Sequence, residues 1–184
     1  MKLDKLQTVS VILIIILITS ACKKDDKPDE TPPVLSVTPV DMSTVTSVIV
    51  FGADLTPSQK NPTFEYIVNN STVQVRSVCK GYIDRIMLND NFPDYEVWIK
   101  TSSNSIWTII YDHVLNLNIS EKDNVNPGDV LGVVGTGNRT ELQINKIINK
   151  EELSYCPFDF GTSEFIQQHT NFTETWCLTD TVIP

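Results

Sequence analysis

Hydrophobic and polar side chains alternate along much of this chain with the two-residue period of β-strands. Val73 and Val75 alternate with polar neighbours, and Ile106–Val114 alternates in the same way. Short segments rich in β-branched and aromatic residues follow this pattern between turn residues: Ser47–Phe51, Thr72–Val78, Tyr82–Leu88, Tyr95–Lys100, Ile106–Val114, Val130–Val134 and Leu142–Ile148. A helical period persists only over Ser163–His169, for about two turns. Evenly spaced strands with tight turns predict an all-β fold, an antiparallel sandwich or barrel.

Residues 1–21 have the pattern of a secretory signal peptide. Lys2 and Lys5 precede an apolar run over residues 11–18. This run is too short to span a bilayer, because a spanning helix needs about 20 apolar residues. Thr19-Ser20-Ala21-Cys22 follows it and resembles a bacterial lipobox, so we expect cleavage before Cys22 and lipidation of that cysteine.

The segment after Cys22 indicates where the folded part begins. Lys23-Lys24-Asp25-Asp26 resembles the tether of lipoproteins in the Bacteroidetes, which implies an outer membrane lipoprotein on the periplasmic or the cell-surface face. Several prolines follow, so we expect residues 22–44 to form a flexible, semi-extended tether. A β-domain over residues 45–155 and a short C-terminal appendage over residues 156–184 complete the chain.

The composition adds a strong acidic balance. Against 14 Lys and Arg residues stand 23 Asp and Glu residues, for a net charge of -9 and a pI of about 4.6. Nucleic-acid-binding proteins usually carry a clustered basic surface, so we expect no nucleic acid partner. Anionic lipid headgroups would repel the same surface, so we expect membrane attachment through the lipid anchor.

Cysteine and histidine are few. With Cys22 used by the anchor, Cys79, Cys156 and Cys177 remain in an oxidising compartment, and one of them must stay free. Cys156 and Cys177 flank the appendage and are the candidate disulfide, worth about 3 kcal/mol in chain entropy. Pairing of Cys156 with Cys79 stays open. His169 lies in the short polar helix, where we expect it to be exposed and without a role.

Five stretches in one order resemble landmarks of the lysostaphin/LytM-type zinc endopeptidases. They are Phe51-Gly52 with Phe64, then Val75–Ile83, Ile106–Val114, Val125–Gly135 and Thr136–Thr140. These endopeptidases are cell-wall hydrolases with a duplicated-hybrid-motif β-fold. The resemblance therefore implies an antiparallel barrel-sandwich hybrid, followed here by the C-terminal appendage.

The family's zinc-binding residues are not kept. In the family, zinc is held by the His and Asp of the first motif and by the second His of the last motif. The resemblance places Glu65, Asn69 and Gln143 at these three positions, and Glu141 at the position of the general-base histidine. Only His113 keeps its family identity, that of a histidine beside the oxyanion. Amides are poor zinc ligands, so we expect no metal, no cofactor and no catalytic residue.

Three functions remain open at this stage. The first is a pseudoenzyme, a catalytically inactive LytM-like domain with a binding or regulatory role in cell-wall metabolism. The resemblance gives its partner as a peptidoglycan peptide or an envelope protein such as an amidase, because degenerate relatives activate amidases. The second is a surface scaffold or adhesion lipoprotein. The third is a hydrolase with a rebuilt site that uses Glu65 and Glu141 as paired carboxylates; a hard-cation site at Glu65, Glu141 and Asn69 is a further alternative.

Overall fold

The computed structural model describes residues 27–178 and 182–183, so the predicted signal peptide and Cys22 lie outside the described residues. The strands are β1 (Val45–Ile49), β2 (Asp54–Thr56), β3 (Gln59–Lys60), β4 (Phe64–Val68), β5 (Gln74–Arg76), β6 (Gly81–Leu88), β7 (Tyr95–Lys100), β8 (Trp107–Leu115), β9 (Asn124–Val125), β10 (Val130–Val134), β11 (Arg139–Ile148) and β12 (Glu151–Tyr155). The helical elements are η1 (Met42–Thr44), η2 (Pro157–Phe160) and α1 (Ser163–Thr170). None of the helices in this part of the chain is long and apolar enough to cross a membrane.

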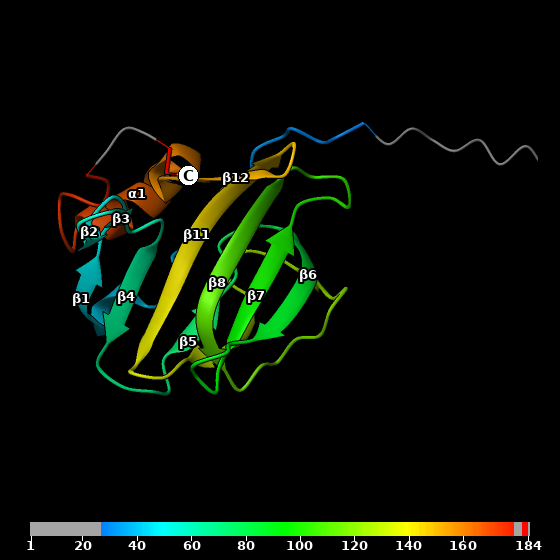
Figure 1. The fold of residues 1–184 in the computed structure, drawn as a ribbon. Helices are drawn as coiled ribbons and strands as arrows, with labels where there is room; N and C mark the ends of the chain where they lie inside the picture. The colour runs from blue at the N-terminus through cyan, green and yellow to red at the C-terminus, as the bar shows by residue number, and fades with distance from the viewer. Residues whose placement is uncertain (1–26, 179–181, 184) are drawn as a thin grey trace, which may run out of the picture.

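One large antiparallel sheet organises the domain. Its strands follow the order β1-β4-β11-β8-β7-β6-β9, and those from β1 to β6 lie side by side in Figure 1. Strand β10 pairs with β8 and β5, strand β12 pairs with the end of β11, and β2 and β3 form a separate small hairpin. The all-β prediction, including a C-terminal appendage, is confirmed.

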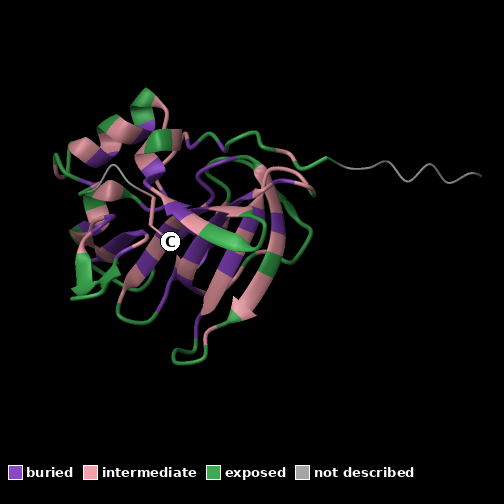
Figure 2. Ribbon diagram, turned by 45° about the horizontal axis from the view of Figure 1, so that its top comes forward, coloured by how far each residue is buried: buried purple, intermediate pink, exposed green. Residues whose placement is uncertain are grey.

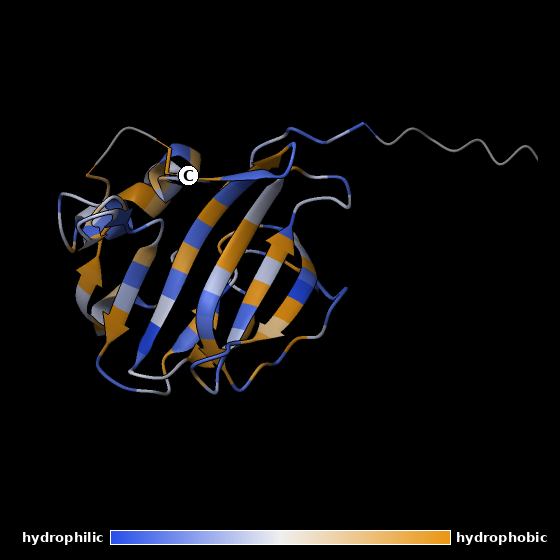
Figure 3. Ribbon diagram, in the orientation of Figure 1, coloured by the Kyte–Doolittle hydropathy of each residue, from blue (hydrophilic) through white to orange (hydrophobic). Residues whose placement is uncertain are grey.

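The alternation seen in the sequence separates the two faces of this sheet. Leu142 and Ile144 on β11 are fully buried, whereas Glu141 and Gln143, which alternate with them, are only partly buried. The same banding of buried and less buried residues runs along neighbouring strands in Figure 2, and bands of apolar and polar residues follow in Figure 3. One face of the central strands therefore closes over the core, and the other carries polar side chains.

The segment expected to be a flexible tether packs against the domain over its described part. Leu35 and Val40 are fully buried. Backbone hydrogen bonds join Leu35 to Phe160 and Thr162, and the amide of Arg76 donates to the carbonyl of Pro39 at 2.8 Å. The prediction of a tether is therefore wrong for residues 27–44, because apolar side chains between the prolines add to the core.

The C-terminal appendage covers one end of the sheet with aromatic rings. Strand β4 supplies Phe64 and Tyr66, and the appendage brings Trp176 against both. Phe165 packs on Phe158 within the appendage, and the side chains of Phe64, Tyr66, Phe165 and Trp176 are fully or almost fully buried. A disulfide joins Cys156 to Cys177 across the appendage, whereas Cys79 is free and buried.

The expectation for His169 is wrong. Its side chain is 0% exposed among these rings, where its Nδ1 donates to the carbonyl of Phe165 at 2.7 Å. The hydroxyl of Tyr66 lies 2.8 Å from Nε2. Phe165 and His169 are four residues apart and share one face of α1, and that face is turned inward.

Candidate functional site

A row of three carboxylates crosses the polar face of the sheet. Glu141 on β11 pairs with Glu65 on β4 at one side and with Asp112 on β8 at the other. Neighbouring strands lie about 4.8 Å apart, so directly opposed side chains on one face are close together. Like charges at such positions destabilise each other unless a cation or a proton intervenes.

Arg139 supplies that cation. It lies two residues before Glu141 on β11, and its Nη1 is 3.0 Å from Oε1 of Glu65. Its Nη2 donates to Nε2 of His113 at 2.6 Å. The guanidinium also lies over the ring of Phe92, 5.4 Å from the ring centroid. Arg139 therefore bridges two of the residues that the sequence singled out.

His113 is held from both ring nitrogens. Its Nδ1 faces Asp94, with Oδ2 at 3.1 Å, and because a carboxylate only accepts, Nδ1 carries the proton. Arg139 only donates, so Nε2 presents its lone pair. The backbone of His113 has φ 57°, a left-handed conformation that is uncommon outside glycine and gathers at functional sites.

Asp94, which bonds to Nδ1 of His113, has a completely buried side chain. It accepts hydrogen bonds from Asn89 at 2.8 Å and from the backbone amide of Thr136 at 2.9 Å. Burial raises the pKa of Asp94, but the hydrogen bonds from Asn89, Thr136 and His113 outweigh it, so the pKa is lowered. An ionised Asp94 thus orients the imidazole of His113.

The pKa of Glu141 is shifted in the opposite direction to that of Asp94. Burial, followed by the negative charges of Glu65 and Asp112, raises the pKa of Glu141 to about 7. Its Oε1 lies 3.8 Å from Nε2 of His113. Glu141 therefore holds a proton in a large fraction of molecules at neutral pH, while Glu65 is paired with Arg139.

His113 and three of the residues around it line one side of a cavity of about 390 Å³. One wall is the loop between β6 and β7, from Asn89 to Phe92, and the other consists of Asp112, His113, Arg139 and Glu141. We call this cavity the groove. Its lining is mostly polar, and hydrogen bonds join Asn89 to Asp112 and Arg139 to His113.

The structure brings together three of the five predicted site residues and separates two. Glu65, His113 and Glu141 meet around Arg139. Gln143 lies on the same face of β11, but its amide donates to Asn145 at 2.8 Å and to Ser154 at 2.9 Å, and it lines a different cavity.

Asn69 lies away from the groove. It follows the last residue of β4, where its backbone amide donates to the carbonyl of Thr44 and its side chain is exposed and accepts from Asn70. Four residues of extended strand separate it from Glu65, a path of about 13 Å. The placement of Asn69 in a common site with Glu65, for zinc or for a hard cation, is therefore wrong.

The residues at the family's zinc positions do not fit zinc. Glu65 is engaged by Arg139, Gln143 is engaged by Ser154, and Asn69 is remote. A different set, Asp94, Asp112 and His113, offers one ligand atom each within 4.8 Å of one another. In the described structure the His113 nitrogens are bonded to Asp94 and Arg139, so a cation there would have to displace one of these bonds.

Three charged residues that contact or adjoin His113 were missed from the sequence: Asp94, Asp112 and Arg139. Asp112 adjoins His113, and Arg139 precedes Glu141 by two positions, so the strand period alone places Arg139 and Glu141 on one face. Asp94 lies in the loop before β7, 19 positions before His113, and no local pattern connects the two.

No protein-family model and no curated protein sequence matches this chain. Solved structures do. The catalytic domain of the antimicrobial peptidase lysostaphin from Staphylococcus simulans has a TM-score of 0.52 at 16% identity, over 65% of this chain and 93% of that one. A catalytic domain of the prophage-encoded protein EnpA from Enterococcus faecalis has a TM-score of 0.51 at 19% identity, over 66% and 92%. A SpoIIQ–SpoIIIAH pore-forming complex gives 0.55 at 13%, over 76% and 98%.

These similarities show the fold. The antiparallel framework is that of lysostaphin and LytM-type domains, which confirms the fold implied by the sequence motifs. A longer lysostaphin structure matches with a TM-score of 0.52 at 14% identity over 62% of this chain, which spans about half, 51%, of that chain's length.

Proposed function

We propose that this chain is a cell-envelope lipoprotein whose LytM-like domain binds a peptidoglycan peptide or an envelope protein without cleaving it. The observation that carries the proposal is the position of Arg139, whose guanidinium links Glu65 to His113. An organic cation thus neutralises the carboxylate that replaces a zinc-binding histidine. The residues at these positions do not fit zinc, so they offer no support for the family's route of activating water and polarising a peptide carbonyl.

The groove's chemistry favours a ligand that carries an amine. Asp112 and Glu141 line the groove beside Asp90. Among the described residues, Arg139 is the one Lys or Arg that lines the groove, and it is already paired with Glu65. An ammonium group would donate hydrogen bonds to the carboxylates of Asp112 and Glu141 and would favour the ionised form of Glu141. Peptidoglycan peptides that contain a free amino group offer such a cation, as does a lysine on a protein partner.

Protein partnering has a precedent among the fold's neighbours. Two of the similar structures are complexes of SpoIIQ with SpoIIIAH, and one of these is described as a pore-forming complex. This chain shares its fold with one chain of each complex. The role proposed here is of this kind, with an amidase among the envelope proteins to be tested.

Binding and hydrolysis are tested on the same protein. Purified muropeptides with a free amine are titrated by calorimetry against the full-length chain and the Glu141→Gln and Asp112→Asn variants. We expect binding that weakens about tenfold in each variant, as for loss of one charge-assisted hydrogen bond. Glu164→Gln is the matched control, because it removes an exposed carboxylate on α1. Equal affinity in all four proteins, or chelator-sensitive cleavage of cross-linked peptidoglycan, contradicts the proposal.

A second candidate is a hydrolase with a rebuilt site. Glu141, whose pKa is raised to about 7, lies opposite Glu65, whose charge is held by Arg139. A carboxyl group with a raised pKa, beside a second carboxylate that forms an ion pair, can supply the acid and the base of such a reaction. Metal-independent turnover of peptidoglycan that disappears in Glu141→Gln would favour this function over binding alone.

The lipid anchor is tested separately. In our proposal Cys22 attaches the chain to the outer membrane, so Cys22→Ala should move the protein from the membrane fraction to the soluble fraction. Cys79→Ala is the control, since this thiol is buried in the domain. Unchanged fractionation of Cys22→Ala contradicts lipidation.

A further inference from the structure

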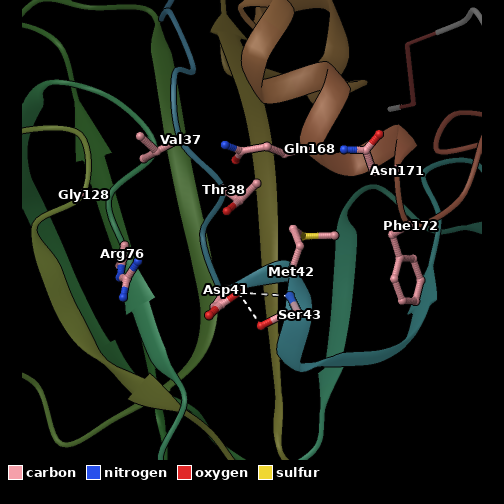
Figure 4. Close-up of a pocket in the computed structure, with 10 residues that line it drawn as sticks. All are labelled: Val37, Thr38, Asp41, Met42, Ser43, Arg76, Gly128, Gln168, Asn171 and Phe172. Atoms are coloured by element: carbon pink, nitrogen blue, oxygen red, sulfur yellow. Dashed lines mark hydrogen bonds between the residues drawn. The ribbon is translucent and has the colours of Figure 1, made fainter.

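A second cavity, of about 590 Å³, lies apart from the groove and shares none of its lining residues. It lies between residues 37–43, the end of β5 and the C-terminal end of α1 (Figure 4). We call it the strap cavity, after the segment 35–43 that forms one wall. Its volume is in the range of small-ligand pockets, about 300–1,000 Å³.

Backbone hydrogen bonds fix the walls of the strap cavity. The amide of Ser36 donates to the carbonyl of Val78 at 2.9 Å, and the amide of Arg76 donates to Pro39 at 2.8 Å. On the other side, the amide of Thr162, the N-cap of α1, donates to the carbonyl of Leu35 at 2.8 Å. The cavity is therefore preformed rather than assembled by loops that must fold around a ligand.

Two opposite charges line the strap cavity without forming an ion pair. The guanidinium of Arg76 has one hydrogen bond among the described residues, to Oε1 of Gln74 at 3.2 Å. No described carboxylate lies within 4.0 Å of it. Asp41 accepts from the amide and hydroxyl of Ser43 at 2.9 and 2.8 Å, both on Oδ1, so Oδ2 is free to accept from a ligand. Arg76 still helps to lower the pKa of Asp41, after the larger effect of Ser43.

The remaining walls offer amide and apolar groups. Gln168 and Asn171 project from the end of α1 toward the strap in Figure 4, and the Asn171 side chain has no hydrogen bond to a described residue. Met42 lies near the centre of the view and Phe172, which is 38% exposed, forms the far side. Side-chain amides bond both the donor and the acceptor of a peptide group.

We propose that the strap cavity binds a short peptide with a free amino group and a free carboxyl group. Arg76 binds the carboxylate, and Oδ2 of Asp41 binds the ammonium. Gln168 and Asn171 bond the peptide groups between them, and an apolar side chain packs on Met42 and Phe172. This site is independent of the groove and of the function proposed for it.

The test uses one tripeptide in three chemical forms. Ala-Leu-Ala with free ends, its N-acetylated form and its C-amidated form are titrated against the isotope-labelled full-length chain in detergent micelles, by NMR. We expect the free form to shift the amide signals of residues 37–43, 76 and 168–172. Blocking either end should weaken binding about tenfold, because each removes one charge-assisted hydrogen bond.

Variants link each end of the peptide to its residue. Arg76→Gln should weaken binding of the free peptide about tenfold but leave the amidated peptide unchanged, and Asp41→Asn should act in the same way on the acetylated peptide. Asparagine is as good an N-cap as aspartate, so η1 is kept. Arg85→Gln and Asp54→Asn, which remove exposed charges elsewhere, are the matched controls.

The proposal is overturned if millimolar free tripeptide shifts no amide of the strap cavity, or if the shifted amides belong to the groove. It is also overturned if blocked and free peptides bind equally, or if the cavity variants behave like the two controls. Melting curves of each variant verify that the fold is intact.

Discussion

The two histidines of this chain are both buried, but their surroundings differ. His113, 3% exposed, lies between the carboxylate of Asp94 and the guanidinium of Arg139, whereas His169, 0% exposed, lies among aromatic rings. Both carry the proton on Nδ1. At His169 this follows because Nδ1 faces the carbonyl of Phe165, which only accepts, so the Tyr66 hydroxyl donates to Nε2.

The two histidines differ in the polarity of their surroundings: charged groups at His113 and aromatic rings at His169. Hydrogen bonds to charged neighbours on both sides give the imidazole of His113 a defined orientation. His113 also lines an open cavity. At His169, burial outweighs the hydrogen bond to Phe165 and lowers the pKa to about 4. The same side chain thus lines an open polar cavity in one region and is part of the hydrophobic core in the other.

The largest expected effect is on the aromatic cluster. Trp176→Ala should lower the free energy of unfolding by about 4 kcal/mol, because a large ring that is 1% exposed leaves a cavity beside His169 and Phe64. The indole also donates to the carbonyl of His169 at 2.9 Å. Urea unfolding under non-reducing conditions measures the change.

Trp98→Ala is the matched change on the groove face, where Trp98 is only partly buried and stacks on Arg85. We expect a loss of about 1 kcal/mol there. Equal losses in the two variants would mean that the appendage is not part of the core.

The next effect concerns the pH dependence of the unfolding free energy. His169 and Glu141 should each contribute roughly 3 kcal/mol, with opposite sign. Burial lowers the pKa of His169 to about 4 from 6.5, so its neutral form favours folding and stability falls as the pH drops from 6.5 to 4. The pKa of Glu141 is raised to about 7 from 4.5, so stability falls as the pH rises from 4.5 to 7. The two contributions oppose each other between pH 4.5 and 6.5.

Single variants reveal each contribution. In Glu141→Gln the remaining His169 should make the protein more stable at pH 6.5 than at pH 4.5, and in His169→Gln the remaining Glu141 should reverse that order. Urea midpoints at both pH values give the result. If both variants depend on pH with the same sign, one of the two environments is misassigned.

The sequence predicted the sheet better than the site. The alternation of Ile106–Val114 identified β8, whereas β4 was missed because Phe64–Val68 is almost continuously buried and shows no alternation. Glu65 and Glu141 were found through their motifs, but their direct opposition depends on the register between β4 and β11, which long-range packing sets.

The errors have physical causes as well. Asn69 was placed in the site by counting along a motif, yet β4 continues as extended strand to Val68 and carries Asn69 out of reach. The polar sequence of its helix predicts an exposed His169, which is wrong because the residue faces the core. A spacing of four residues from Phe165 was the available local signal that both face the core.

Arg139→Gln is the third prediction and acts on the groove alone. Glu65, whose side chain is 8% exposed, loses its ion pair, and Nε2 of His113 loses its donor. We expect a loss of about 2 kcal/mol in unfolding free energy, below the value for a fully buried pair because Arg139 is 30% exposed. Arg85→Gln, an exposed arginine, should change stability by less than about 0.5 kcal/mol. Equal effects would show that Arg139 is not structural in the groove.

Tyr66→Phe is the smallest change and tests the polar contact inside the aromatic cluster. It deletes the hydroxyl that donates to Nε2 of His169 and keeps the ring, so the expected loss is about 1 kcal/mol. The hydrogen bond stabilises neutral His169, so its loss should also make the remaining His169 easier to protonate as the pH falls. A double-mutant cycle with His169→Gln isolates the contact: a coupling energy near zero would mean that Tyr66 and His169 are neighbours by packing alone.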